Sequence, residues 1–311
     1  MKTRKSVLLT FAIAAALGVA LASCSSSPPT QIAPIEARQL DNTQSKLAGD
    51  TAHRRPIVGL ALGGGGLRGL AHIGVLQALE QAGIQPDLVV GTSAGALVGA
   101  AYASGKTPQE IEELAREVSI PSFVDFTFSS RGIMRGDNIA AWVDTIVEQV
   151  PMEAFPIKFA AVATDLQRGV PVLLERGAPG NAVRASASVP GVQVPVPYQD
   201  GYLVDGGISS LVPVRAARAL GADIVIAVDI YCHASQAAGL SAAAVLRQTM
   251  HTQSCLLAAP ELGEADIRIL PAVVVPGISD KEQQLQTIKI GYEAARKALA
   301  ATSSLPVRRV R

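Results

Sequence analysis

Residues 88–101 constrain the fold of this chain more than any other part of the sequence. Residues 88–90 are the apolar run Leu-Val-Val, and residues 96–101 continue as a helix of small residues. Between them lies Gly91-Thr92-Ser93-Ala94-Gly95, a G-x-S-x-G pattern that places a serine on a sharp, strained turn from strand to helix. Side chains at the two glycines would collide where strand and helix approach. The segment predicts an α/β fold, with Ser93 either a nucleophile or part of a tight turn.

A glycine-rich loop lies between the preceding strand and helix. Residues 57–62 are typical of a buried strand, and residues 70–79 have helical apolar spacing. The loop that joins them, Gly63-Gly64-Gly65-Gly66-Leu67-Arg68-Gly69, contains the G-x-G-x-x-G pattern of dinucleotide-binding folds. Those folds expect an acidic residue at the end of the second strand, and P-loops expect Gly-Lys-Ser/Thr. Neither is present, which weakens the interpretation as a nucleotide site.

The same loop is suited to an oxyanion hole. Consecutive small residues let backbone N–H groups converge on one oxygen, and the dipole of the helix after Ser93 adds positive potential. The candidate donors are the N–H groups of Gly64, Gly65, Gly66 and Ala94. Arg68 has three interpretations: it steadies the loop, binds an anionic head group, or is a surface arginine at a helix start.

A serine hydroxyl needs a neighbouring base to accept its proton. His53 lies in polar sequence, and we expect His72 to pack or bond locally on the first helix. His233 follows a predicted strand and completes the order Ser93, Asp205, His233 that is typical of α/β-hydrolases. Against this triad, Ser93 follows only the second predicted strand and is preceded directly by a glycine loop.

Asp205 itself is the other candidate base. It ends a short predicted strand, and Gly206 and Gly207 allow its turn to approach the serine closely. An aspartate has an unperturbed pKa of about 3.9, and partial desolvation raises that pKa toward the range of a general base. A plain Asp-Gly-Gly turn is the structural alternative.

Composition limits the classes of fold and partner. The chain has 311 residues, 49% of them hydrophobic and 17% charged, with a net charge of +1. This length and hydrophobicity predict one large α/β domain, and the near-zero charge gives no support to a nucleic-acid partner. Aromatic residues make up only 4% of the chain. A core of Ala, Val, Leu and Ile suits a three-layer α/β/α fold with a mostly parallel central sheet.

The N-terminus predicts an export signal. Basic residues precede the apolar run 7–21, which is too short for a comfortable membrane span. The run ends in Leu21-Ala22-Ser23-Cys24, which resembles the lipobox of bacterial lipoprotein signal peptides. That resemblance implies removal of residues 1–23 and lipidation of Cys24, and Ser25 resembles the signal for the periplasmic face of the outer membrane. An ordinary secretory signal is the alternative.

The remaining chain divides by composition. We expect a flexible tether over residues 24–55, a folded hydrolase domain over 56–302 and a C-terminal tail over 303–311. Cys232 and Cys255 either form a disulfide or remain two buried thiols. The aromatic stretch with Phe123, Phe126 and Phe128 is either a flap over a pocket or ordinary packing.

Three motifs in order identify a family resemblance. The glycine loop 63–69, the turn 91–95 and Asp205-Gly206-Gly207 resemble the oxyanion loop, nucleophile elbow and catalytic aspartate of the patatin-like phospholipase family. Residues 184–191, Arg-Ala-Ser-Ala-Ser-Val-Pro-Gly, are similar to a further block of that family. One departure is that Ser209-Ser210-Leu211-Val212-Pro213 replaces the Asn-Pro-type turn of many relatives.

The resemblance implies a function. It implies a patatin-like fold and a Ser93–Asp205 dyad without histidine that hydrolyses phospholipids or other fatty acyl esters, with no metal or organic cofactor. Gly91, Gly95, Gly206, Gly207 and Arg68 would then support the dyad. An adaptor lipoprotein that keeps the fold but works by binding is the alternative of a different class.

Overall fold

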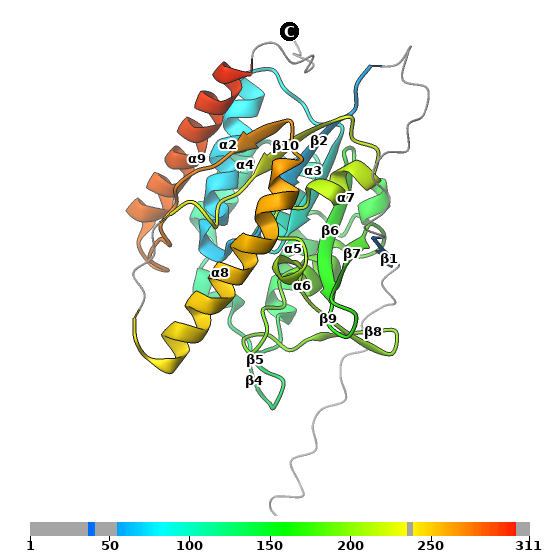
Figure 1. Cartoon of the computed structure of the whole chain (residues 1–311), viewed down its shortest axis with the longest axis vertical. Helices are drawn as coiled ribbons and strands as arrows, with labels where there is room; N and C mark the ends of the chain where they lie inside the picture. Colours follow the sequence, from blue (N-terminus) through cyan, green and yellow to red (C-terminus); the bar gives the residue numbers. More distant parts are fainter. Residues whose placement is uncertain (1–36, 41–54, 235–238, 303–311) are drawn as a thin grey trace, which may run out of the picture. The chain divides into compact units, whose positions relative to one another are not determined.

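A mixed, mostly parallel sheet forms the centre of the computed structural model, which describes residues 37–40, 55–234 and 239–302 (Figure 1). The strand order is β1-β7-β6-β3-β2-β10-β11. The parallel strands are β6 (Lys158–Asp165), β3 (Leu88–Thr92), β2 (Val58–Leu62), β10 (Ile224–Val228) and β11 (Ile267–Ile269). The predicted α/β fold with a mostly parallel sheet is confirmed.

Antiparallel strands complete one side of this sheet. β7 (Val170–Leu174) pairs with β6, and β1 (Ala37–Gln39) pairs with β7. Residues 37–39 fall within the predicted tether and nevertheless add a strand to the domain. Cys24, His53, the predicted signal peptide and the predicted tail lie outside the described residues.

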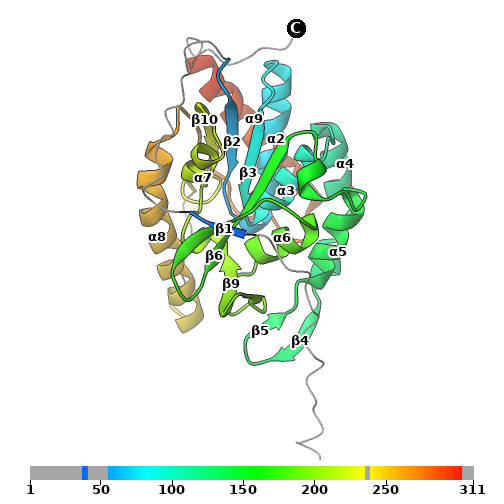
Figure 2. The same cartoon turned by 90° about the vertical axis from the view of Figure 1, so that its right-hand side faces the viewer.

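Helices cover both faces of the sheet, as Figure 2 shows edge-on. One face carries α2 (Leu70–Gln81), α3 (Ala94–Ala103), α4 (Pro108–Glu117), α5 (Asp137–Ile146), α6 (Pro179–Ser186) and α9 (Lys281–Ala301). The other face carries α7 (Val214–Ala219) and α8 (Ala242–Gly263). In the described part of the chain, no helix combines the length and the apolar character needed to cross a membrane.

The core lies between these layers. β2, β3 and β10 are buried along their whole length, and most of the buried hydrophobic residues are Ala, Val, Leu and Ile. Small side chains on α3 let this helix pack closely on β3. Burial on both faces explains why these strands are continuous apolar runs in the sequence.

β6 brings two distant segments together. β3 pairs with the first part of β6, ending with Thr92 opposite Val162. β9 (Gly201–Asp205) pairs antiparallel with the last part of β6, with Asp205 opposite Ala163. β7 occupies the other edge of β6, so β3 and β9 run toward each other along one edge, and their carboxyl ends meet.

Candidate active site

Ser93 lies on a strained turn between β3 and α3. Its φ of 54° and ψ of −119° place it in a backbone conformation that costs energy for a residue with a side chain. A Cβ at Gly91 would lie 2.4 Å from the backbone nitrogen of Ala96, and one at Gly95 would lie 2.1 Å from the carbonyl oxygen of Leu62. Only glycine fits at either position, as the G-x-S-x-G pattern predicts.

Asp205 meets Ser93 at the junction of β3 and β9. Thr92 lies opposite Val162 and Asp205 opposite Ala163 on β6, so the Ser93 side chain comes close enough to the Asp205 carboxylate to lower its pKa. Each residue is only 8% exposed, so the pair is largely shielded from water. The structure therefore brings together the two residues that the sequence motifs single out.

Hydrogen bonds hold both the backbone and the side chain of Asp205. The Asp205 N–H donates to the Ser188 carbonyl oxygen at 2.9 Å, and the Thr164 hydroxyl donates to the Asp205 carbonyl oxygen at 2.9 Å. The Gly207 N–H donates to Oδ1 of Asp205 at 2.7 Å. A Cβ at Gly206 would lie 2.1 Å from the Val162 carbonyl oxygen, so the Asp-Gly-Gly turn packs directly against β6.

Burial makes Asp205 a stronger base than an exposed aspartate. Desolvation raises its pKa to about 6, against the opposing effect of the hydrogen bonds from Ser93 and Gly207. At neutral pH the carboxylate is ionised, yet its affinity for a proton is close to what a general base needs.

The glycine loop lies beside Ser93 and offers backbone donors. A Cβ at Gly64 would lie 3.4 Å from the Ser93 Cβ. The Gly64 N–H, however, donates to the Leu211 carbonyl oxygen at 3.0 Å. The prediction that Gly64 is an oxyanion donor is therefore wrong, because its N–H already has a partner.

The other candidate donors remain available. Within the described residues, the N–H groups of Gly65, Gly66 and Ala94 donate to no protein acceptor. Gly66 has a φ of +58°, and no atom lies within 4 Å of the place where its Cβ would be. Ala94 follows Ser93 directly, and Gly65 and Gly66 follow Gly64, the glycine that lies beside Ser93.

Arg68 supports the glycine loop from inside the protein. Its Nε donates to the Val273 carbonyl oxygen at 3.1 Å, and its Nη1 lies 3.5 Å from the Gly65 carbonyl oxygen. The guanidinium also lies 5.1 Å from the centre of the Tyr231 ring. Because Arg68 is buried, the interpretation that it steadies the loop is correct and that of a surface arginine is wrong.

The histidines have other partners. His72 is buried, and its Nε2 lies 2.8 Å from the Gly63 carbonyl oxygen, with desolvation lowering its pKa to about 4. The Nε2 of His233 lies 3.1 Å from Asp229. A Ser93–Asp205–His233 triad would require His233 to pair with Asp205 instead, so the structure contradicts this alternative.

Three supporting residues were not predicted individually. The Ser93 N–H donates to Oγ of Ser186 at 2.8 Å, and this hydroxyl donates onward to the Val162 carbonyl oxygen. The Thr164 hydroxyl contacts both the Asp205 carbonyl oxygen and the Ser209 hydroxyl. Ser186 does lie in the block 184–191, so the family resemblance pointed to the segment without giving a role.

Glu261 supports the segment that departs from the Asn-Pro pattern. The Ser210 hydroxyl donates to the Glu261 carboxylate at 3.0 Å, and the Ser210 carbonyl oxygen accepts from the Thr92 hydroxyl at 2.9 Å. The Arg215 N–H donates to Glu261 at 2.9 Å. Burial raises the pKa of Glu261 to about 7, and the residue links α8 to the strand end that carries Ser93.

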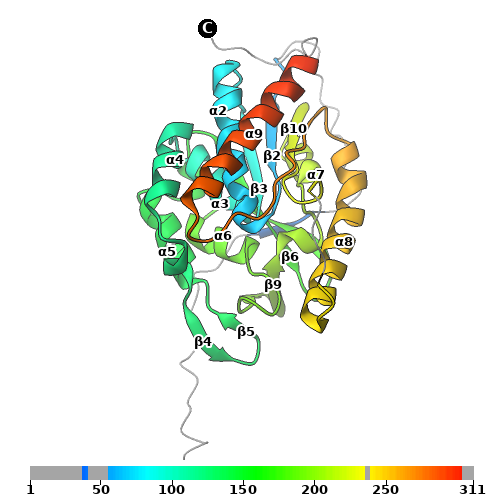
Figure 3. The same ribbon diagram turned by 90° about the vertical axis from the view of Figure 1, so that its left-hand side faces the viewer.

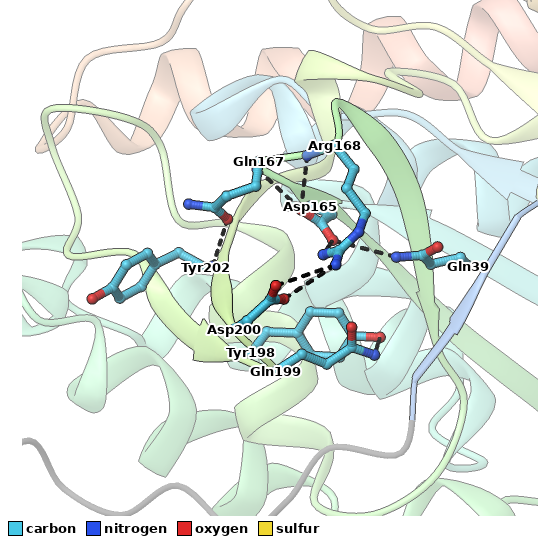
Figure 4. A network of polar contacts seen from close by, with 8 residues as sticks. All are labelled: Gln39, Asp165, Gln167, Arg168, Tyr198, Gln199, Asp200 and Tyr202. Carbon is cyan, nitrogen blue, oxygen red and sulfur yellow. Dashed lines mark hydrogen bonds and ion pairs between the residues drawn. The ribbon is translucent and has the colours of Figure 1, made fainter.

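A second polar network holds the hairpin of β8 (Val196–Tyr198) and β9, at the end of which Asp205 lies (Figure 4). The buried Asp165 accepts from Arg168 at 2.9 Å, and Arg168 also reaches Asp200 at 3.1 Å. Oε1 of Gln167 accepts from the Tyr202 N–H at 2.8 Å. Burial alone would raise the pKa of Asp165, but the hydrogen bonds from Arg168 and Gln167 outweigh it and lower the pKa.

Cys232 and Cys255 form a disulfide, with their Cα atoms 5.6 Å apart. It joins the segment after β10 to α8. His251 of α8 lies 3.1 Å from the Tyr231 carbonyl oxygen and packs against the Tyr231 ring. In the described part of the chain, no group of three or more His, Cys, Asp or Glu residues is placed to hold a metal ion.

Comparisons with known proteins show which sequences this chain resembles. An uncharacterized NTE family protein of Mycobacterium tuberculosis is 40% identical over 178 residues, which cover 56% of this chain and 49% of that protein. Patatin-like phospholipase domain-containing protein 6 of Mus musculus is 33% identical over 181 residues, covering 56% of this chain and 13% of that protein. The chain thus matches about half or less of the length of these curated relatives.

A solved structure with a similar fold and a matching family model add to these sequence relatives. The crystal structure of VipD from Legionella pneumophila has a TM-score of 0.56 at 16% identity, covering 79% of this chain and 67% of that one. That likeness shows a shared fold. A family model described as patatin-like phospholipase matches residues 60–218, more than half of the chain and including both Ser93 and Asp205. This chain therefore belongs to the patatin-like phospholipase family.

Proposed function

We propose that this protein hydrolyses fatty acyl esters of lipids, with Ser93 as the nucleophile and Asp205 as the general base. The observation that carries the proposal is the meeting of two buried residues at the carboxyl ends of β3 and β9: Ser93 on its strained turn, and Asp205 with a pKa raised to about 6. Family membership supports a serine lipid acyl hydrolase as the class of enzyme.

The first half of the reaction forms an acyl-enzyme. Oγ of Ser93 attacks the ester carbonyl carbon while its proton passes to Asp205. The N–H groups of Gly65, Gly66 and Ala94 stabilise the resulting oxyanion. When the tetrahedral intermediate collapses, Asp205 returns the proton to the departing alcohol, such as a lysophospholipid.

The second half releases the fatty acid. Water attacks the acyl-enzyme and gives a proton to Asp205, the same N–H groups stabilise the second oxyanion, and the proton returns to Oγ of Ser93. Each oxyanion donor should lower the barrier by about 3 kcal/mol. Because Arg68 fixes the glycine loop, the Gly65 and Gly66 N–H groups need little rearrangement during the reaction.

Two variants test this proposal. Ser93→Ala and Asp205→Asn should each lower turnover of phospholipid vesicles and of a soluble fatty acyl ester by at least about a thousandfold. The products are measured by mass spectrometry. Ser104→Ala, at the opposite end of α3, and Asp280→Asn, which keeps the N-cap of α9, are matched controls that should retain activity. Full activity in either site variant would overturn the proposal.

A fluorophosphonate probe separates turnover from a binding role. The probe should label Ser93 in the wild type and fail to label Ser104, because only an activated serine reacts. An adaptor that uses the fold without turnover would show neither labelling nor products. This outcome would replace the hydrolase with the binding function.

The N-terminal motif supports a proposal about location. Lipidation of Cys24 would place the domain at the periplasmic face of the outer membrane of a bacterium, close to phospholipid substrate. Mass spectrometry of the mature protein should find an N-terminal cysteine with lipid on both its thiol and its amino group in the wild type. In Cys24→Ser, loss of the protein from the membrane fraction is expected, and unchanged fractionation would overturn lipidation.

A further inference from the structure

A hairpin near the active site carries apolar side chains that face solvent. It consists of β4 (Phe126–Ser129) and β5 (Gly132–Met134), and it projects from the body of the domain (Figures 1 and 3). Phe128 is fully exposed and Phe126 is 77% exposed, whereas Phe123 packs edge-on against Trp142. The packing interpretation of these phenylalanines therefore holds for Phe123 alone. Such exposed aromatic groups mark an interaction surface.

The apolar surface continues from the hairpin to Asp205. The Ile133 N–H donates to the Val192 carbonyl oxygen, and both side chains are exposed. Val192 belongs to the segment that begins at Ser188, whose carbonyl oxygen holds the Asp205 N–H. Exposed apolar side chains within this stretch, and just after the Asp-Gly-Gly turn, are those of Val189, Val192 and Ile208.

Arg131 ties the hairpin to the strand that carries Asp205. It donates to the Tyr202 hydroxyl at 3.0 Å, and its guanidinium lies 5.4 Å from the centre of the Tyr202 ring. Tyr202 belongs to β9. Arg131 thus links the hairpin to the strand that ends in the proposed base.

α8 provides a second apolar projection. Ala244, Ala258 and Leu262 face the domain, and the opposite face carries exposed apolar residues at helical spacing: Val245, Leu246, Met250, Leu256 and Leu257. Leu240, just before the helix, is 94% exposed. All three ribbon views show the first turns of α8 and the β4–β5 hairpin at the same end of the domain (Figures 1, 2 and 3).

The charges on these two segments have one sign at the surface. Arg131, Arg135 and Arg247 are exposed, with Arg135 at 3.4 Å from Asp137. The acidic residue within 124–136, Asp125, is buried and accepts three backbone N–H groups. Residues 239–257 contain no acidic residue. An apolar projection with basic residues complements an anionic lipid surface.

We infer that the β4–β5 hairpin and residues 240–250 form a docking surface for an anionic lipid bilayer, which holds the domain against the membrane that contains its substrate. This inference rests on the proposed function, because a lipid ester must leave a bilayer to reach Ser93. Phe126, Phe128, Leu240 and Leu246 enter the boundary between head groups and acyl chains, while the arginines contact phosphate groups.

Single tryptophans report which residues enter the bilayer. The full chain is used with Ser93→Ala, so that lipid is not consumed, and with Trp142→Phe, which removes the native tryptophan. Phe128→Trp or Leu246→Trp places a probe on the docking surface. Gln85→Trp is the control, because exposed Gln85 precedes β3 at the opposite end of the parallel strands.

Vesicles of phosphatidylcholine and phosphatidylglycerol in equal parts, with brominated acyl chains, supply the quencher. The fluorescence of the probes at positions 128 and 246 should shift to shorter wavelength and be quenched, and that of the control probe should not. Any N-terminal anchor is the same in all three chains, so the difference reports orientation. Equal quenching at all three positions, or none at position 128, would overturn the inference. Equal quenching on phosphatidylcholine alone would overturn the preference for anionic lipid.

A second experiment connects the surface to turnover. Phe126→Ser with Phe128→Ser should lower hydrolysis of vesicle phospholipid by about tenfold or more and leave hydrolysis of a monomeric soluble ester unchanged. Phe126→Leu with Phe128→Leu, which keeps the apolar character, should retain vesicle activity. Equal loss on both substrates would contradict docking and indicate a structural defect.

The two experiments separate this inference from the proposed function. A wild type inactive on the soluble ester would refute the hydrolase, while the tryptophan probes would still test docking. A blue shift of the Phe128→Trp probe without vesicles, together with a dimer in sedimentation, would show that a second copy of the chain covers the surface and would overturn the lipid assignment.

Discussion

Burial of Asp205 determines how the proposed dyad responds to pH. The unfolded chain exposes this carboxyl group, with a pKa of about 3.9, whereas the folded protein raises the pKa to about 6. The burial that makes the carboxylate more basic therefore also makes its ionised form less stable in the folded protein. Both consequences can be measured separately.

The pH dependence of turnover follows from the need for an ionised base. The kcat/KM for a soluble ester should be level above about pH 7 and fall tenfold per unit below about pH 6, as Asp205 becomes protonated. A pH–rate profile measures the midpoint. A rate that stays constant down to pH 4 would contradict Asp205 as the base.

The stability of the folded protein should respond in the opposite direction. Below pH 4 both the folded and the unfolded chain hold the proton. Between about pH 4 and pH 6 the unfolded chain releases it first, and the free energy of unfolding falls by up to about 3 kcal/mol. Asp205→Asn carries no such charge. Its free energy of unfolding relative to the wild type should therefore rise between pH 4 and pH 7 in urea titrations; a constant difference would refute the raised pKa.

His233 provides the test of a dyad against a triad. Its imidazole pairs with Asp229, which also accepts the N–H groups of Tyr231 and Cys232. His233→Ala should therefore keep kcat/KM within about twofold of the wild type. Loss of turnover with an unchanged circular dichroism spectrum would instead show that a histidine takes part.

At the scale of elements, α6 positions the nucleophile through one hydroxyl group. Ser186 accepts the Ser93 N–H and donates to the carbonyl oxygen of Val162 on β6. It therefore connects α6, the strained turn and the central strand. Without it, a buried N–H group at the most strained residue of the site would lack a partner.

Ser186→Ala should lower the free energy of unfolding by about 1–3 kcal/mol and should lower kcat more than it changes KM. Ser188→Ala is the matched control, because its hydroxyl donates only within the same segment, to the Arg184 carbonyl oxygen. The control should cost stability while keeping kcat. Equal effects of both variants on kcat would remove the special role of Ser186.

The elements show what the sequence could predict. Gly91 is required by Ala96 within the turn itself and Gly95 by Leu62 on the neighbouring strand β2, and the G-x-S-x-G motif records both. Gly64 was misassigned because its partner, Leu211, lies far along the chain. The role of Ser186 depends equally on a distant contact, and no local pattern distinguishes the exposed Phe126 from a buried phenylalanine. Local sterics are readable in sequence, whereas the choice of hydrogen-bond partner is made by the fold.

At the scale of the whole molecule, α8 joins the active site to the proposed docking surface. Its carboxyl end carries Glu261, which bonds Ser210 behind the strand end of Ser93. Its middle is fixed by the disulfide and by His251 against Tyr231, which in turn packs on Arg68 of the glycine loop. The helix α8 thus contacts residues next to the active site and also carries the exposed apolar face.

The disulfide should contribute measurably to stability. It closes a loop with a sequence separation of 23 residues, and a loop of that length is worth about 3 kcal/mol. Cys232→Ser with Cys255→Ser should lower the free energy of unfolding by that amount, as should reduction of the wild type. Reductant should leave the double variant unchanged; a further loss there would show that another effect is measured.

The shared edge of β6 also has a consequence for how the protein is made. β3 delivers Ser93 early in synthesis, whereas β9 delivers Asp205 only after β6 and β7 have emerged. Until β9 pairs beside β3, Ser93 lacks the carboxylate that the proposed mechanism gives it as a base. Under the proposed mechanism, an unfinished or unfolded chain is harmless to the lipids of the cell that produces it. The pairing of β9 with β6 is then the step that completes the proposed dyad.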